Sequence, residues 1–336
     1  MGSLLPLSPR VELEQAEKLR RTSIGTDFER SVLLEHEVMD LNIPKTKFLL
    51  NNFITEKSIN LVNGFRGMGK SWFVEMAANG ITWGDSVGPW KVGKSVHTLL
   101  VDGEMPMSLL QERIKRMNRF RDIRFKESLL FIYPESYAYR IGLKRANLLD
   151  AKWRQSITEV IEKHNIELLI LDNLSSLAPG IDENTTLDFN PINRWMLELR
   201  FIGCSIILTH HTGKSGEQRG TTAHEDHVDT SIMLNRPAGY LPSDGCKFIC
   251  KIIKDRSHLT EGKQYTLQLC ENEKGYLEFE TVMDTGIEEA CKLLGDNADI
   301  TQTEAIEFGI SRMTFQRAKE RLGLKKRKYE RRTDEN

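Results

Sequence analysis

The octapeptide from Gly64 to Ser71 leaves the surrounding chain few folds to adopt. It has the pattern Gly-x-x-x-x-Gly-Lys-Ser of a phosphate-binding loop, with an apolar run before it and an amphipathic run after it. Glycine lets consecutive amides turn toward an anion, and a helix that begins at the loop adds its positive dipole end. We therefore predict a nucleoside triphosphate site whose contacts come from Gly64, Phe65, Arg66, Gly67, Met68, Gly69, Lys70, Ser71 and Trp72.

An aspartate at the end of a wholly apolar run supplies the second part expected of such a site. Residues 168–172 read Leu-Leu-Ile-Leu-Asp. A strand that is apolar throughout is covered on both faces, as in the centre of a parallel sheet, and ligands of such sheets bind at the carboxyl ends of the strands. We expect Asp172 and the hydroxyl of Ser71 to hold Mg²⁺, while Lys70 reaches the β- and γ-phosphates.

The order of the apolar segments predicts an α/β fold. Strand-like runs alternate with helical ones through the first two thirds of the chain, which predicts a mostly parallel sheet flanked by helices on both faces. Ser108 and Gln111 have the spacing of a capping box, so we expect a helix to begin at Ser108. Three later strand-like runs are joined by short turns and predict an antiparallel extension, at 247–253, 264–269 and 276–280.

The last part of the chain, residues 285–336, has a different character. Thr301 and Glu304 form a capping-box pattern that opens a helix at Gln302, and Ser311 is the expected N-cap of the next helix. Two helices joined by a short turn are typical of a helix-turn-helix. We expect a small all-α or winged-helix domain that follows an N-terminal arm (1–44) and a nucleotide-binding domain (45–284).

Polar and basic side chains of this last region predict contacts with DNA. The exposed face of the final helix and the basic tail offer groups that suit phosphates, at Arg312, Gln316, Arg317, Lys325, Lys326, Arg327 and Lys328. A small helical bundle with a solvated charged tail is the alternative interpretation of the same residues.

Composition excludes few classes of protein. The 336 residues have a formal net charge of −1, so only local charge argues for a polyanionic partner. No apolar run approaches the roughly 18 residues of a membrane span, and we expect a cytoplasmic protein without a membrane partner. The N-terminal arm is either disordered or packs on a neighbouring subunit.

Together the motifs resemble one family. The phosphate loop, Asp102-Gly-Glu104, Leu171-Asp172, Thr209-His210-His211 and Arg219-Gly-Thr-Thr look like the RecA-like ATPases of the RepA type, within the RecA/DnaB superfamily. These are hexameric replicative helicases of plasmids, phages and mobile elements. The resemblance covers about residues 45 to 280. It implies a RecA-like P-loop NTPase core, ATP and Mg²⁺ as cofactors, and a homo-oligomer in the form of a hexameric ring.

The resemblance also implies catalytic roles. Glu104 resembles the carboxylate that polarises the attacking water, and Asp102 is the alternative. His210 resembles the sensor of the γ-phosphate, and His211 is the alternative. Lys70 completes this set within one subunit.

Three further cations resemble groups that act on the nucleotide of a neighbouring subunit. Arg219 lies where RepA-type proteins carry an arginine finger, which stabilises charge in the transition state. Lys254 and Arg256 resemble the basic pair that DnaB-like helicases place in the adjacent site. Residues 178–189 are expected to form a loop at the place where members of the superfamily approach single-stranded DNA. This loop departs from the superfamily, because it holds Asp182, Glu183 and Asp188 but no lysine or arginine, and its charge opposes DNA binding in the pore of the ring.

The sequence thus predicts an ATP-hydrolysing, oligomeric motor that acts on DNA in the manner of a replicative helicase. Two alternatives remain open. One is an ATP-switched DNA-binding regulator of a mobile element, in which the acidic loop poses no difficulty. The other is an ATPase that remodels a protein partner, with a role in defence against foreign DNA.

Overall fold

The computed structural model describes residues 26–121, 129–181, 186–211, 227–237, 240–282, 285–296, 300–308, 310, 312–322 and 324. The chain divides into two compact units, Met1–Lys47 and Phe48–Asn336. In the described part of the first unit, the helices α2 (Asp27–Ser31) and α3 (Glu35–Asp40) bury none of their side chains. The domain limits expected at residues 44 and 284 remain predictions.

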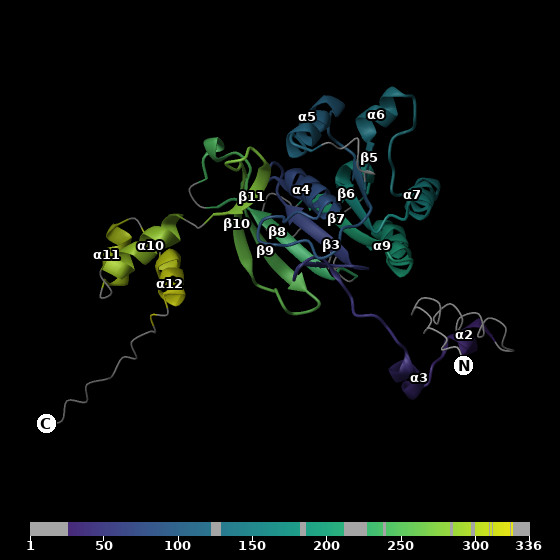
Figure 1. Ribbon diagram of the computed structural model, residues 1–336, viewed down its shortest axis with the longest axis horizontal. Coiled ribbons are helices and arrows are strands. Elements are labelled where there is room, and N and C mark those ends of the chain that lie inside the picture. Colours follow the sequence, from purple (N-terminus) through teal and green to yellow (C-terminus); the bar gives the residue numbers. More distant parts are fainter. Residues whose placement is uncertain are drawn as a thin grey trace, which may run out of the picture. The chain divides into compact units, whose positions relative to one another are not determined.

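A large sheet organises the second unit (Figure 1). In the described residues the strand order is β11-β10-β9-β8-β3-β7-β6-β4-β5. A separate two-stranded sheet pairs β1 (Phe48–Leu50) with β2 (Ile54–Thr55). The strands of the large sheet are β3 (Ile59–Gly64), β4 (Thr98–Asp102), β5 (Leu130–Pro134), β6 (Leu168–Asp172), β7 (Ser205–His211), β8 (Thr230–Asn235), β9 (Lys247–Asp255), β10 (Gln264–Glu271) and β11 (Leu277–Thr281).

The pairing confirms the predicted fold class. From β5 to β8 every neighbouring pair is parallel, and from β8 to β11 every pair is antiparallel. Because the parallel strands run in one direction, their carboxyl ends meet at one edge, where Gly64, Asp102, Asp172 and His211 end their strands. The residues expected at the nucleotide site thus come from neighbouring strands of one sheet.

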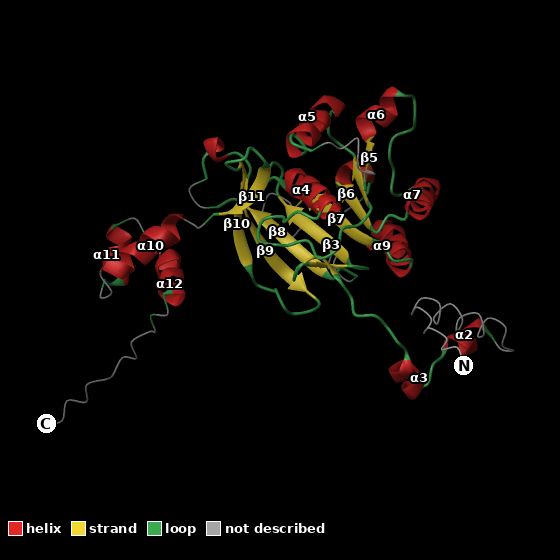
Figure 2. Ribbon diagram, in the orientation of Figure 1, coloured by secondary structure: helices red, strands yellow, loops and turns green. Residues whose placement is uncertain are grey.

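Helices cover both faces of the parallel part (Figure 2). On one face, α4 (Lys70–Trp83) packs Phe73, Val74 and Ala77 into a core that also contains Leu168 and Ile170 of β6. On the other face, α7 (Ala151–His164) and α9 (Thr186–Phe201) pack against Leu169 and Leu171 of the same strand. Successive strand residues point to opposite faces, so an apolar run such as β6 needs cover on both sides.

Some predicted helix limits were wrong. The helix α5 (Met107–Met117) begins one residue before Ser108, and its N-cap is Pro106, which makes no side-chain cap hydrogen bond. The start of α9 at Thr186 lies within the segment expected to be a loop. The short helices α6 (Glu135–Arg140) and α8 (Leu174–Leu177) follow directly on β5 and β6 and were not expected. Of the N-terminal arm expected at residues 1–44, the structure describes residues 26–44.

The described residues from 285 onward form α10 (Thr285–Asp296), α11 (Gln302–Glu307) and α12 (Arg312–Arg321). The predicted capping box is confirmed, because the Thr301 hydroxyl accepts from the Glu304 amide while the Glu304 carboxylate accepts from the Thr301 amide. A small apolar cluster that includes Leu294, Ala305 and Phe315 holds the helices together. Among all described helices, none is both long and apolar enough to cross a membrane.

Candidate nucleotide-binding site

The phosphate loop joins β3 to α4 with two glycines in the left-handed region. Gly67 has φ +73° and Gly69 has φ +94°, and Gly69 is the N-cap of α4. A Cβ on Gly69 would lie 2.7 Å from Cys246 Sγ and 3.1 Å from the Phe248 ring. Both backbone conformation and space therefore require glycine at this position.

The side chain of Lys70 folds back over the loop. Its Nζ donates to the carbonyl oxygens of Gly64 at 2.7 Å and Phe65 at 3.1 Å. Burial lowers the pKa of Lys70 to about 8. These bonds hold a cation beside the loop, where a triphosphate would neutralise it.

A cavity of about 680 Å³ opens in front of the loop. Its walls include most of the residues predicted to bind the nucleotide, from Arg66 to Trp72, together with Glu104 and Asp172. They also include side chains that were not predicted, among them Arg113, Asn173, Arg236 and Tyr240. A volume of this size is typical of a small-molecule site.

Two oxygen donors expected to hold Mg²⁺ lie together. Asp172 ends β6, is 4% exposed, and accepts hydrogen bonds from the hydroxyls of Thr209 (2.6 Å) and Ser71. Burial raises the pKa of this carboxyl, while the two hydroxyls act in the opposite direction. A carboxylate beside a hydroxyl at a phosphate loop is a donor set that fits Mg²⁺.

The carboxylates of Asp102 and Glu104 occupy different surroundings. Asp102 is 2% exposed and accepts from the amides of Glu104 (3.1 Å) and Met105 (2.7 Å), and burial raises its pKa to about 6. Glu104 is exposed and accepts from Asn173 Nδ2 at 2.6 Å. Asp102 is thus engaged in shaping the turn, whereas Glu104 lies at the cavity with its orientation fixed by Asn173.

Of the two histidines at the end of β7, His211 lies at the cavity. Its Nδ1 is 2.8 Å from Lys70 Nζ, and burial lowers its pKa to about 4, so the neutral ring can accept from the lysine. Strand alternation explains why His211 and not His210 lies at the cavity. His211 points to the same face of the sheet as Thr209, whose hydroxyl donates to Asp172. His210 points to the opposite face and is 5% exposed. The geometry therefore favours the alternative left open by the sequence.

The predicted basic pair lies at the opposite end of the sheet from this cavity. Because β9 is antiparallel to β8, Asp255 pairs with Thr230, which in turn pairs with Asn60 near the start of β3. Lys254 and Arg256 therefore flank the amino ends of the parallel strands and do not line the cavity of their own chain.

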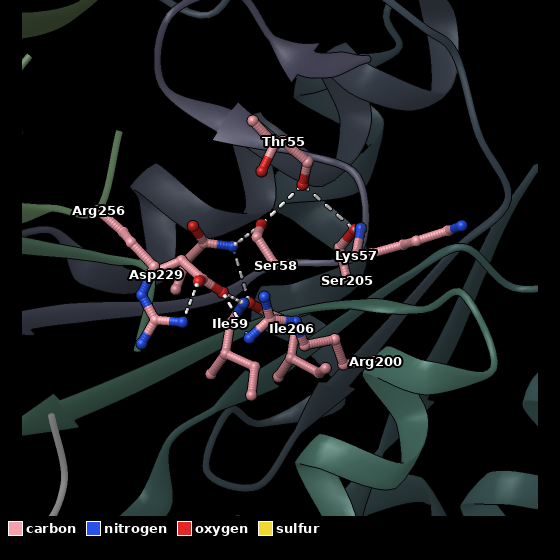
Figure 3. Close-up of polar contacts among 10 residues, drawn as sticks. Thr55, Lys57, Ser58, Ile59, Arg200, Ser205, Ile206, Asp229 and Arg256 are labelled. Carbon is pink, nitrogen blue, oxygen red and sulfur yellow. Dashed lines mark hydrogen bonds and ion pairs between the residues drawn. The ribbon is translucent and has the colours of Figure 1, made fainter. Parts of the chain in front are cut away.

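Arg256 is held there by an aspartate (Figure 3). Its guanidinium lies 3.3 Å from Asp229 Oδ1, and Arg200 approaches Oδ2 from the other side at 3.4 Å. The amide of Ile59 donates to the same carboxylate at 2.9 Å. Asp229 thus joins β3, β8, α9 and the end of β9.

Other predicted residues fall partly or wholly outside the described chain. Arg219 and residues 325–328 lie there. In α12, Arg312 and Arg317 are exposed and Gln316 is half-buried. The structure places none of the described ones among the residues that line the nucleotide cavity.

Two arginines at the cavity were missed by the sequence analysis. Arg113 lies over the Trp72 ring at 4.3 Å, and its NH1 donates to both oxygens of Glu75 at 3.0 and 3.1 Å. Arg236 donates to Gly67 O at 2.6 Å and lies 3.9 Å from the Tyr240 ring. Arg236 directly follows β8, and that position at the carboxyl end of a parallel strand was an available signal.

Comparisons with known proteins give one family. A family model described as an AAA domain (AAA_25) matches residues 26–217. No curated protein matches the sequence. Among solved structures, a KaiC-like protein from the hyperthermophilic archaeon Pyrococcus horikoshii is similar, with 16% identity and a TM-score of 0.49 over 69% of this chain and 93% of that chain.

Proposed function

The chain belongs to the AAA_25 family of AAA domains, and from that premise we propose that it hydrolyses ATP in an oligomer that acts on DNA. One observation carries the ATP-hydrolysing part of the proposal: the cavity gathers a phosphate loop, the paired donors Ser71 and Asp172, and the oriented carboxylate of Glu104. Phosphoryl transfer needs little beyond positioning and charge stabilisation, and these groups supply both.

The proposed roles follow from the geometry. Loop amides and Lys70 bind the β- and γ-phosphates; Ser71 and Asp172 would hold a Mg²⁺ ion, which would neutralise further phosphate charge. Glu104 accepts the proton of the attacking water, because its carboxylate lies at the cavity and Asn173 fixes its orientation. His211 contacts Lys70 and is the group best placed to respond when the γ-phosphate leaves.

One wall of the cavity offers aromatic and cationic side chains on which the base of the nucleotide can stack. Trp72 with Arg113, and Tyr240 with Arg236, form two stacked pairs that both line the cavity. Planar rings and guanidinium groups stack on purines. We place the adenine against these pairs.

Steady-state ATPase of the wild type and of Lys70→Ala tests the proposal. We expect the substitution to lower kcat by about 100-fold or more, since it removes a cation from the developing charge. Matched turnover by the two proteins would refute the site. Assays with and without single-stranded DNA, and strand-separation assays, separately test the motor and helicase part: no stimulation and no unwinding would leave an ATPase only.

A second candidate function has a structural observation of its own. The helices α10–α12 have their own apolar cluster, and α12 exposes Arg312 and Arg317. An ATP-switched regulator would use this region to bind one duplex sequence. Sequence-specific binding that disappears when residues 285–336 are deleted, in a protein without unwinding activity, would favour it.

A further inference from the structure

A second cavity adjoins the turn that carries Glu104. Its volume is about 400 Å³, and its walls come from that turn, from α6 and from the loop after α6, at Gly103, Glu104, Glu135, Ser136, Tyr139 and Arg145. The register explains the location, because Pro134 at the end of β5 pairs with Asp102 at the end of β4. The segment after β5 therefore begins beside the Glu104 turn, at the edge of the sheet (Figure 1).

The segment that forms this cavity is basic and aromatic. Residues 136–149 contain three cations and no acidic residue. We call the five exposed aromatic and cationic side chains among them the α6 surface: Tyr137, Tyr139, Arg140, Lys144 and Arg145, beside which Ile141 and Leu143 are also exposed. The exposed fractions of the two tyrosines are 48% and 70%. Exposed rings interleaved with cations offer both a stacking platform and phosphate contacts.

Arg145 is oriented by a buried carboxylate. Its Nε donates to Glu135 Oε1 at 3.2 Å, and Glu135 is itself 7% exposed. The amide of Ala146 (3.1 and 3.0 Å) and the hydroxyl of Tyr133 (2.9 Å) bind the same carboxylate. The guanidinium is thereby fixed at the cavity although 64% of its side chain is exposed. A preorganised guanidinium loses less entropy when it binds a phosphate.

We propose that the α6 surface binds single-stranded nucleic acid, with a base stacked on Tyr139 and the adjoining phosphate on Arg145. Unpaired bases fit better than a duplex, since bases within a duplex are already stacked and expose no ring face. The bound strand then lies next to the Glu104 turn, so the contact couples nucleic acid to the ATPase site. The role of Glu104 in this coupling rests on the proposed function, whereas binding at the α6 surface does not.

Fluorescence anisotropy with a labelled oligothymidylate of about 20 nucleotides tests the contact. All proteins are full-length and carry Lys70→Ala, so that hydrolysis plays no part. We expect Tyr139→Ala to weaken binding by about 5- to 100-fold. We expect Arg145→Gln, which keeps an amide donor for Glu135, to reduce the slope of log affinity against log salt by about 0.7. Thermal melts verify that each variant is folded.

Matched controls lie elsewhere on the same domain. Phe201 is 80% exposed and the side chain of Arg194 is 85% exposed, and we expect Phe201→Ala and Arg194→Ala to leave the affinity within twofold of the parent. A labelled oligouridylate run in parallel supports the inference if the same variants lose affinity, because RNA presents the same bases and phosphates. Tyr139→Ala without effect, or equal competition by polyglutamate, would overturn it. If the wild type hydrolyses no ATP but the α6 variants still have a lower affinity for the oligonucleotide, the proposed function is wrong and the proposed nucleic-acid contact is supported.

Discussion

At the scale of single residues, the fold changes the ionisation of the buried carboxyl of Glu75. It is 1% exposed, and burial raises its pKa to about 8, although Arg113 acts in the opposite direction. A raised carboxyl pKa stabilises the folded state below the unfolded value near 4.5, and this stabilisation is lost as pH rises to about 8. We expect the nucleotide-free protein to lose on the order of 2 to 4 kcal/mol between pH 5.5 and 8 through this group.

Urea denaturation of the wild type and Glu75→Gln at both pH values measures the effect. The difference in unfolding free energy, wild type minus variant, should fall as pH rises. An equal difference at pH 5.5 and pH 8 contradicts the assignment of this titration to Glu75.

Gly103, between the two carboxylates of the turn, has no room for a side chain. A Cβ there would lie 2.7 Å from Leu177 Cδ2 and 3.2 Å from Ser176 Oγ. We expect Gly103→Ala to destabilise the fold by about 1–3 kcal/mol and to lower kcat, because the turn that positions Glu104 must shift. Leu177→Ala creates space at the same contact, so the double variant should be less destabilised than the sum of the singles by about 1 kcal/mol. If the losses of unfolding free energy in the two single variants simply add up in the double variant, Gly103 and Leu177 do not crowd each other.

The sequence predicted which residues belong to the phosphate loop, because phosphate binding there depends on residue types at a fixed local spacing. It favoured His210 over His211, whereas His211 lines the cavity, since only the phase of β7 determines which of the two neighbours faces it. The role of Arg113 could not be predicted from the sequence for another reason. Its partner Glu75 is 38 positions away, and only the packing of α5 on α4 brings the two side chains together.

At the scale of elements, Asp229 is a junction between four of them. Removing its carboxylate leaves the Ile59 amide without its acceptor and takes a counter-charge from Arg200 and Arg256. We expect Asp229→Ala to lower the free energy of unfolding by about 2–4 kcal/mol. Asp229→Asn should cost less, since its amide oxygen still accepts from Ile59.

An exposed carboxylate serves as the control for this measurement. Glu198 pairs with Arg194 one turn away on α9, and both side chains are largely exposed. Glu198→Ala should change stability by less than about 0.5 kcal/mol. If chemical denaturation gives the two alanine variants the same stability, Asp229 does not join the elements as described.

Element types were predicted well because alternation and apolar runs decide them, as for β6, whose limits were predicted without error. Helix starts were harder to predict. Pro106 is the N-cap of α5, which begins at Met107 although the Ser108–Gln111 pattern favours a later start, because a fixed φ makes proline compatible with a helix terminus. The short α6 has too few turns for a periodic signal, and it was missed.

At the scale of the whole molecule, the prediction to test is that cations of one subunit act on the nucleotide of its neighbour. Arg219 lies outside the described residues, and Arg256 is at the opposite end of the sheet from the cavity of its own chain. If Arg219 acts on a neighbour, Arg219→Ala and Glu104→Gln should each be inactive alone. A one-to-one mixture should regain roughly a quarter of the competent interfaces, because each interface needs one intact residue from each copy.

Steady-state ATPase of the mixture is the measurement. The matched control replaces the second protein with the double variant Arg219→Ala/Glu104→Gln, which can complete no interface and should restore nothing. If the mixture of the two single variants also regains no activity, Arg219 acts within its own subunit or has no role in hydrolysis.

The strand β9 also has a mechanical consequence. At one end Phe248, with Cys246 just before the strand, lies close to Gly69 of the phosphate loop, and directly after the other end Arg256 forms an ion pair with Asp229. The nine residues of β9 span about 30 Å, with a register shift against β8 between Ser231 and Ile232. We therefore expect that a displacement of the phosphate loop would reach the Asp229 contact, at the opposite edge of the domain, through this one strand.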